Sequence, residues 1–337
     1  MKQSVNYVQR YSLTDLFDRT FRMIGSSWKV SLLGGLVVIG PAAILLAVVV
    51  PLQIKNVIAI SLQASTSAGA DLREVFGILL WTGLSMLSGI VYSVAALWAR
   101  LAVVHSVRDA ATATAPQWHN ALRQALHVSL LRVVGQAVLK ALIGAACIAI
   151  PTILFALVAS GDGWVPPLLI AVIYLGATAV FTWIFFSFFF SAEAVVFDGE
   201  RTVAGMGRSW RLVGGNWWRL FGITILVTIM ISFVAGLITT PIVGASLVPI
   251  SANIVDLVLS DTASEQAVLQ AFSNTTPLSI AIALATIVQQ LISLIFVPVF
   301  YALFYIDLKV RHGELESRAT DSPGAGEAPS EESPRGE

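Results

Sequence analysis

Three ionisable residues hold equivalent positions near the ends of three apolar segments. The segments read WARLAVVHSV, SAEAVVFDGE and YIDLKVRHGE, and their alignment places Arg100, Glu193 and Asp307 in one column. Charges among apolar residues are costly unless they are paired or reach water. Two interpretations stay open. The residues form an inter-repeat charge cluster in which Arg100 pairs with one of the acids, or each side chain extends separately to the membrane surface.

Uncharged polar residues inside two apolar runs are further candidates. Gln289 and Gln290 lie near the middle of the last run, and Ser85 and Tyr92 recur at helical spacing in the second run. Such side chains can line a ligand site, but interhelical hydrogen bonds and close packing use the same residue types. These four residues are therefore candidate intramembrane polar positions, with both uses open.

The sequence contains no recognisable catalytic or cofactor motif. A nucleophile elbow, an HExxH pair, a P-loop and a glycine-rich dinucleotide turn are all missing. The four histidines do not have the spacing of metal ligands, and the single cysteine, Cys147, lies in an apolar run. We expect no cofactor, no metal and a role without catalysis, although an intramembrane enzyme stays open.

The composition indicates which solvent surrounds these residues. Hydrophobic residues make up 56% of the 337 residues and charged residues only 12%, whereas soluble domains carry about 25% charged residues. Much of the surface must therefore face lipid. A formal net charge of zero argues against nucleic acid as a partner. The expected partners are the lipid bilayer and a membrane or cytoplasmic protein.

Six apolar runs are long enough to cross a membrane as helices, which requires about 20 residues each. They cover roughly residues 30–51, 76–99, 141–160, 167–190, 219–249 and 279–306. With both termini in the cytoplasm, eighteen of the twenty Lys and Arg residues lie on the cytoplasmic side, and Lys55 and Arg73 remain outside. The positive-inside rule therefore predicts a multi-pass protein with cytoplasmic termini.

Short related segments precede three of these runs. Residues 19–28, RTFRMIGSSW, match residues 208–217, RSWRLVGGNW, and residues 118–133, WHNALRQALHVSLLRV, form a weaker copy. Each has an apolar stripe with basic residues opposite, which is typical of a helix lying in the membrane interface. We expect their cationic and tryptophan side chains to contact lipid headgroups: Arg19, Arg22, Trp28, Arg208, Arg211 and Trp217.

The predicted fold is an all-α integral membrane protein with six transmembrane helices. It consists of three parallel repeats, each an interfacial amphipathic helix followed by a helical hairpin. The repeats cover about residues 12–104, 117–197 and 202–310 of a membrane domain at 1–314. Residues 315–337, rich in Pro, Gly, Ser and Glu, are predicted to be a disordered cytoplasmic tail.

The sequence resembles a family of bacterial polytopic proteins labelled glycerophosphoryl diester phosphodiesterase membrane domain. The resemblance rests on LTDLFDRTFRMIGSSW, RSWRLVGGNWWRLFGI and ALFYIDLKVRHGELE, and it covers most of residues 11–316. It implies a location in the bacterial plasma (inner) membrane. The catalytic barrel that some members carry has no counterpart here, so the phosphodiesterase activity does not transfer.

Two functions follow as expectations. The first is a non-catalytic membrane protein that anchors, scaffolds or regulates partners in envelope or lipid homeostasis. The alternative is a transporter or lipid-handling protein that uses a cavity between the repeats. A polar cavity of a few hundred cubic ångströms would favour the second function, and a filled interior would favour the first.

Overall fold

The described part of the protein is built from helices and turns, without strands. The structure, a computed structural model, describes residues 11–66, 72–111, 117–159, 167–259 and 276–314. Six of its helices are long and apolar enough to cross a membrane. The prediction of an all-helical membrane protein with six spanning segments is therefore confirmed, whereas the proposed tail at 315–337 lies outside the described residues.

Most of the long helices extend beyond the apolar runs of the sequence, whereas α5 ends before its run does. The spanning helices are α1 (Leu13–Thr66), α2 (Leu72–Ala111), α4 (Leu130–Ala159), α5 (Pro167–Ser187), α8 (Trp217–Leu259) and α10 (Thr276–Arg311). Shorter elements connect them at one end: α3 (Trp118–Gln124), a π-helical turn η1 (Ala125–Ser129), α6 (Ser191–Asp198) and α7 (Thr202–Val213). Helices satisfy every backbone group internally, which is why apolar runs of this length adopt them in lipid.

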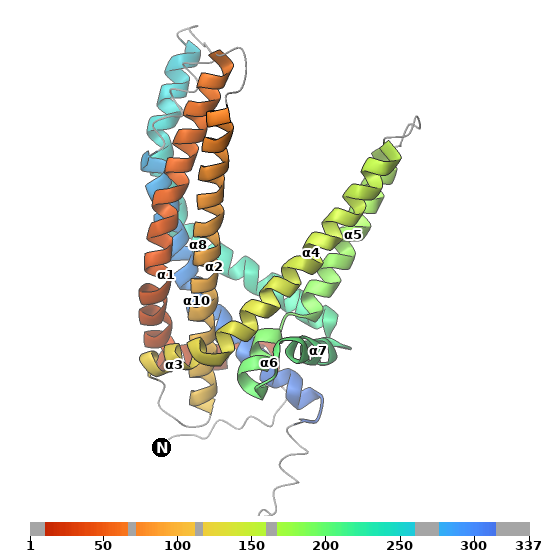
Figure 1. The fold of residues 1–337 in the computed structure, drawn as a ribbon. Helices are drawn as coiled ribbons and strands as arrows, with labels where there is room; N and C mark the ends of the chain where they lie inside the picture. The colour runs from red at the N-terminus through yellow and green to blue at the C-terminus, as the bar shows by residue number, and fades with distance from the viewer. Residues whose placement is uncertain (1–10, 67–71, 112–116, 160–166, 260–275, 315–337) are drawn as a thin grey trace, which may run out of the picture.

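The helices form a bundle and a separate hairpin that meet at one end (Figure 1). In the bundle α1 packs against α2 and α10, and α8 packs against α10. The α4–α5 hairpin diverges from the bundle, and its contacts with other elements are made through η1, α2, α6, α7 and α8. The first residue of α1 and the last residue of α10 lie at the end where the two parts meet.

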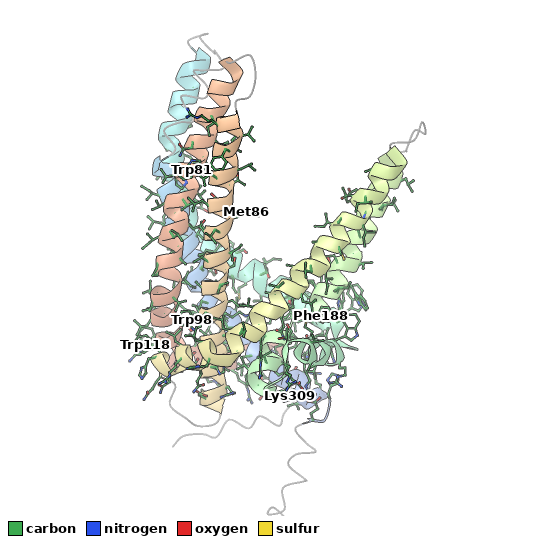
Figure 2. All side chains as sticks on the ribbon, in the orientation of Figure 1. Trp81, Met86, Trp98, Trp118, Phe188 and Lys309 are labelled. Atoms are coloured by element: carbon green, nitrogen blue, oxygen red, sulfur yellow. The ribbon has the colours of Figure 1, made fainter. Side chains whose placement is uncertain are left out.

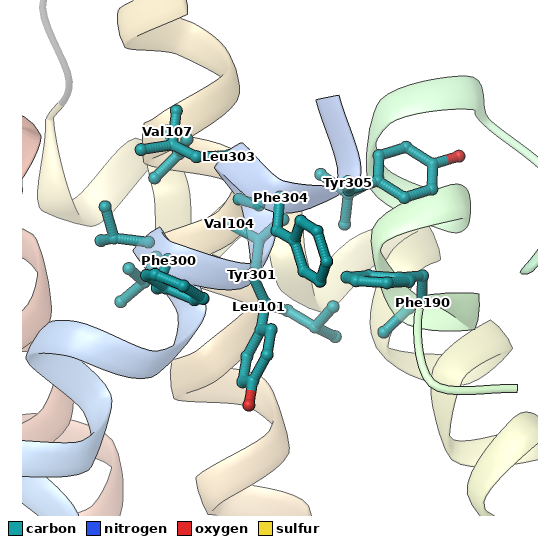
Figure 3. Packing of buried hydrophobic residues seen from close by; sticks show 14 of the residues in the cluster. Leu101, Val104, Val107, Phe190, Phe300, Tyr301, Leu303, Phe304 and Tyr305 are labelled. Atoms are coloured by element: carbon teal, nitrogen blue, oxygen red, sulfur yellow. The ribbon is translucent and has the colours of Figure 1, made fainter. Parts of the chain in front are cut away.

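The most completely buried core lies at this shared end. It is formed by residues 101–104 of α2, residues 194–196 of α6 and residues 299–305 of α10. The ring of Phe304 is directed toward Phe190, with the ring centroids 5.6 Å apart in an edge-on arrangement (Figure 3). Aromatic pairs of this kind add about 0.5–1.5 kcal/mol beyond the area that they bury. The core thus fixes α6 against α10 and holds the base of the hairpin.

Away from this end, apolar side chains point outward. Met86 of α2 is 67% exposed and projects from the bundle, while Leu142 on α4 is 62% exposed and Leu175 on α5 is 72% exposed (Figure 2). Trp98, Trp118 and Phe188 lie at a similar height near the base of the molecule. An apolar outer surface with aromatic side chains at the base suits a lipid-facing protein and its membrane interface.

The three leading segments differ in structure. Residues 202–213 form a separate helix, α7, as predicted, and residues 118–129 join α4 through the π-helical turn. Residues 13–28 are instead the start of α1, one helix of 54 residues, so the expectation of a distinct interfacial helix is wrong there. The predicted start of the third span at residue 141 is also corrected, because α4 begins at Leu130.

A single aligned position explains why the first and third copies differ. Gly215, which follows the C-cap residue of α7, has a φ of 82°, and Ser26 occupies the matching position in α1. Glycine adopts positive φ at little cost, whereas a residue with a Cβ resists it by about 1–2 kcal/mol. The helix therefore stops after Val213 but continues through Ser26. The organisation of the chain into three repeats stays a prediction.

Candidate functional site

Arg100 and Glu193 meet where the hairpin joins the bundle. Arg100 Nη2 on α2 donates to Glu193 Oε1 on α6 over 2.8 Å. The Glu193 side chain is fully buried, whereas that of Arg100 is 31% exposed. Arg100 Nε and Glu193 Oε2 are buried and have no hydrogen-bond partner among the described residues. The pair therefore leaves one cationic donor and one carboxylate oxygen unused.

Lys140 is a further cationic residue within the spanning helices and was missed in the sequence. It lies within α4, inside a segment apolar enough to span the membrane. Its ammonium has no hydrogen bond or ion pair with any described residue. The signal that could have revealed it is a lone lysine directly next to an apolar run. Lys140 falls outside the predicted span because that span was predicted to begin at residue 141.

Two cavities open on either side of α10 and share Arg100 in their walls. One, of about 300 Å³, lies between α1, α2 and α10, and its polar lining consists of Ser93, Arg100, Gln290 and Ser293. The other, of about 330 Å³, lies between α8, α10 and the turn before α6. Its polar lining comprises Arg100, Thr224, Thr228, Ser232, Gln289, Gln290, Ser293 and Tyr301. Both volumes reach the lower range of small-molecule sites.

The structure brings the two candidate glutamines to these cavities. Gln289 is exposed and lines one cavity, and Gln290 is half-buried and lines both. The Tyr92 hydroxyl of α2 lies near the Gln290 amide, although it has no hydrogen bond within the described residues. Ser85 Oγ is also buried without a partner there, farther along α2, and it lines neither of these two cavities.

Asp307 does not join the Arg100 cluster. Its fully buried carboxylate accepts from Arg219 Nη1 over 2.7 Å, from Arg311 Nε over 2.9 Å and from the Tyr11 backbone N–H over 2.8 Å. Arg219 and Arg311 also donate to the Tyr11 carbonyl. The three residues of the alignment column are therefore not brought together, because Arg100 pairs with Glu193 and Asp307 has other partners. Asp307 fastens Tyr11, two residues before α1, to the start of α8 and the end of α10.

A second network joins α6, α7 and α10. Asp198 at the end of α6 accepts from Lys309 Nζ over 2.6 Å, from the Tyr305 hydroxyl over 2.5 Å and from Arg208 Nε over 3.1 Å. Arg208 also pairs with Glu314. Burial opposes the charged form of Arg208, but its hydrogen bond to Asp198 and the nearby carboxylates raise its pKa above the ordinary value. Arg208 thus binds protein carboxylates, where the sequence predicted lipid headgroups.

The remaining interfacial residues have mixed surroundings. Arg22, Trp28 and Arg211 are exposed, which leaves them free to meet headgroups. Arg19 instead donates to the Tyr11 hydroxyl over 2.8 Å and stacks on its ring. Trp217 Nε1 donates to the Trp183 carbonyl over 3.3 Å, which ties the start of α8 to α5.

The start of α1 has a complete capping arrangement. Ser12 Oγ donates to Asp15 Oδ2 over 2.6 Å, and the Asp15 N–H donates to Ser12 Oγ over 3.1 Å. The hydroxyl and the Ser12 backbone N–H lower the pKa of the Asp15 carboxyl below 3.8. Nearby, burial raises the pKa of the Tyr11 phenol above 10.0, so this group keeps its proton.

One buried histidine lies beside a serine hydroxyl. His105 Nε2 and Ser129 Oγ lie 3.0 Å apart, both buried. His105 Nδ1 has no hydrogen-bond partner among the described residues, whereas a base in nucleophilic catalysis is usually oriented by a third group. Within the described ranges, no cluster of His, Cys, Asp and Glu has the arrangement of a metal site.

Comparison with known proteins gives a family for the chain. The family described as "Domain of unknown function (DUF7847)" matches residues 38–308, which include both cavities and most of the charge network around them. No curated protein matches. No solved structure matches either.

Proposed function

We propose that this chain, which belongs to the DUF7847 family, is a lipid-handling membrane protein that binds an amphiphile in the two cavities at Arg100. The observation that carries the proposal is the pair of partly open cavities among the spanning helices, each lined by both polar and apolar residues. Concave sites that combine a few polar groups with apolar walls are where small molecules bind.

The lining suits a molecule with a polar head and an apolar chain. Arg100, Ser293 and Gln290 offer hydrogen-bonding groups in both cavities. Leu97, Val297 and Ile231 supply apolar wall. Ionisable side chains within spanning helices are expensive, and a ligand pathway is a common reason for them. A lipid or related amphiphile can enter from the bilayer without crossing water, which agrees with cavities situated among spanning helices.

A scaffolding function is the second candidate. It is favoured by the α4–α5 hairpin, which diverges from the bundle and leaves Leu142, Ile148 and Ile153 more than half exposed. A partner helix could cover this surface, and lipid could cover it as well. The anchoring or regulation of partners in envelope homeostasis therefore remains an alternative to ligand binding.

Several finer assignments accompany the proposal. We infer a location in the bacterial plasma membrane, with both termini in the cytoplasm and three parallel repeats. The basic-residue distribution supports the orientation. The resemblance to the membrane domain of glycerophosphodiester phosphodiesterases supports the bacterial location. The same resemblance carries no phosphodiesterase activity here, because the catalytic motif is missing from the sequence.

The test is whether an amphiphile stays with the protein and leaves when the cavities are filled. Ser293 lines both cavities, so Ser293→Trp should occupy their shared part. Ile282, on the same helix and 49% exposed, provides the matched control Ile282→Trp. Native mass spectrometry after mild detergent extraction should detect a bound amphiphile on the wild type and the control, and not on Ser293→Trp. Equal retention by all three proteins would contradict the proposal.

A further inference from the structure

We propose that the cavity between α8 and α10 selects an amphiphile whose head is uncharged and carries several hydroxyl groups, as a sugar or a glycerol does. This inference rests on the proposed function and names the ligand class for the same site. It is carried by the chemistry of the cavity lining. Two helices contribute hydroxyl and amide groups to this lining, and its one charged residue is already paired.

The polar groups of the lining follow one face of each helix. On α8 they are Thr224, Thr228 and Ser232, and on α10 they include Gln289 and Ser293. Residues four positions apart lie on the same face of a helix, and the two helices pack against each other. The α8 groups extend over about 12 Å along the helix axis. The cavity therefore offers several hydrogen-bonding groups in a row, which suits a head with several hydroxyls.

The hydroxyls of this row keep their hydrogen-bonding capacity. Thr224 Oγ1 is buried and has no partner among the described residues, and Thr228 and Ser232 make no side-chain hydrogen bond within that part of the chain. By contrast, Thr239 on α8 and Thr286 on α10 donate to the carbonyl four residues earlier, a common arrangement for hydroxyls in helices. An unpartnered polar group away from water is costly. A ligand hydroxyl, which both donates and accepts, can bond to each of these groups.

The electrostatics of the lining disfavour a charged head. Arg100 is the one charged residue that lines the cavity, and its guanidinium pairs with the fully buried Glu193 carboxylate over 2.8 Å. An anionic head would compete with Glu193 for the same cation, so one of two like charges would stay uncompensated. A cationic head would find no carboxylate in the lining. A neutral head avoids both costs.

Tyr301 adds a further hydroxyl with an apolar ring beside it. The hydroxyl points away from the rings of Phe190 and Phe304 (Figure 3), and the residue lines the cavity. Its ring packs edge-on against Phe189, another lining residue, with the centroids 4.6 Å apart. A side chain with an apolar body and a polar tip suits the boundary between the head and the chain of an amphiphile.

Five probes with equal chains separate the heads. They are octyl β-glucoside, 1-O-octylglycerol, octyl phosphate, octylphosphocholine and 1-octanol, each added below its micelle concentration to the full chain in an amphipol. Affinity is read from the dependence of the melting temperature on probe concentration, since a ligand of the native state raises it. The glucoside or the glycerol ether should bind about tenfold more tightly than the other three, as two neutral hydrogen bonds provide. Tighter binding of the glucoside assigns a sugar, and tighter binding of the glycerol ether assigns a glycerol.

Paired hydroxyl variants test the contacts. The double variant Thr224→Val, Thr228→Val removes two cavity hydroxyls with little change in volume, so it should weaken binding of the preferred probe by about tenfold. The matched control is the double variant Thr239→Val, Thr286→Val. It removes two hydroxyls that donate within their own helices and line neither cavity, so its binding should equal that of the wild type.

Removal of the Glu193 charge tests the exclusion of anions. Glu193→Gln leaves Arg100 without its counter-ion, so this variant should gain binding of octyl phosphate relative to the wild type. An ion pair that only holds α2 against α6 would leave the order of the probes unchanged. If Glu193→Gln does not fold, the order of the five probes on the wild type decides.

The outcomes for the two proposals are distinct. If no probe binds, or if Ser293→Trp binds each probe as the wild type does, the proposed ligand site itself is lost. If a charged probe binds most tightly, or if 1-octanol binds as tightly as the glucoside and the glycerol ether, the cavity remains a ligand site. Its selection of a neutral, hydroxylated head is then overturned. Unchanged binding by the Thr224→Val, Thr228→Val protein would overturn that selection as well.

Discussion

At the residue scale, buried charges in this protein divide into a saturated group and an unsaturated one. Asp307 accepts three hydrogen bonds, and its carboxylate has two arginine partners. Glu193 has one arginine partner and an oxygen without a hydrogen bond among the described residues. A saturated buried charge stabilises the fold, whereas an unsaturated one has capacity left for a ligand.

Removing the Asp307 charge should therefore affect stability. Asp307→Asn leaves Arg219 and Arg311 without their shared counter-charge, and loss of one partner of a buried pair costs about 3–5 kcal/mol. We expect the free energy of unfolding in detergent to fall by that order. Asp18→Asn, which changes an exposed carboxylate on α1, is the control and should change it by less than about 0.5 kcal/mol. Equal effects of the two variants would contradict the assignment.

The Asp15 carboxyl gives a prediction about pH. Its pKa is lowered in the folded protein because Ser12 donates to the charged form. This contribution to the stability of the first turn is present above the unfolded pKa and is lost as the pH falls through the lower, folded pKa. In Ser12→Ala the pKa of Asp15 should rise toward 3.8, as measured by NMR of a labelled carboxyl carbon. An unchanged pKa would show that the cap has no effect.

The sequence revealed the residue types of the site better than their partners. Arg100 and Glu193 were placed together by the repeat alignment, and the structure brings them within 2.8 Å. The same alignment failed for Asp307, because Arg219 and Arg311 lie closer to it. Alignment reports position along a helix, whereas pairing depends on how neighbouring helices are rotated and tilted. Lys140 was missed because the start of α4 could not be located from hydropathy alone.

At the element scale, the break between α7 and α8 depends on the backbone conformation of one residue. Gly215 has a φ of 82°, and the equivalent residue of α1 continues a helix. The sequence predicts a helix in both copies. The copies differ at one aligned pair of residues, which is Gly–Gly before α8 and Gly–Ser within α1. Hydrophobic periodicity is similar in both segments, so it could not reveal the break.

Substitution of Gly215 should destabilise the protein through this conformation. No atom lies within 4 Å of the position where a Cβ would be at Gly215, so Gly215→Ala introduces no clash. The positive φ alone should cost about 1 kcal/mol. Gly222→Ala, inside α8 with equally open space, should instead stabilise by about 0.5–1 kcal/mol. Unfolding in detergent measures both, and a loss of similar size in both variants would exclude the backbone explanation.

At the scale of the whole molecule, six spans place the ends of the described chain together. The start of α1 and the end of α10 lie where the hairpin and bundle meet. That end also holds the Asp198 and Asp307 networks. The number of spans could be predicted from the sequence, because each span is a local run of apolar residues. The divergence of the hairpin depends on contacts between distant helices, so no local pattern revealed it.

The orientation of the molecule can be tested with reporter fusions. The positive-inside rule places the connection after α2 and the end of α10 in the cytoplasm. Fusions after Asn120 and Glu314 should therefore fluoresce with a reporter that folds only in the cytoplasm. Fusions at Ala70 and Ala263 should be active only with a reporter that requires export. The two pairs of fusions control for one another. A site that activates the cytoplasmic reporter should leave the export-dependent reporter inactive, and the reverse should hold at the other two sites. A cytoplasmic signal at Ala263 would contradict six spans, since it would require α8 to turn back within the membrane or α10 to begin inside.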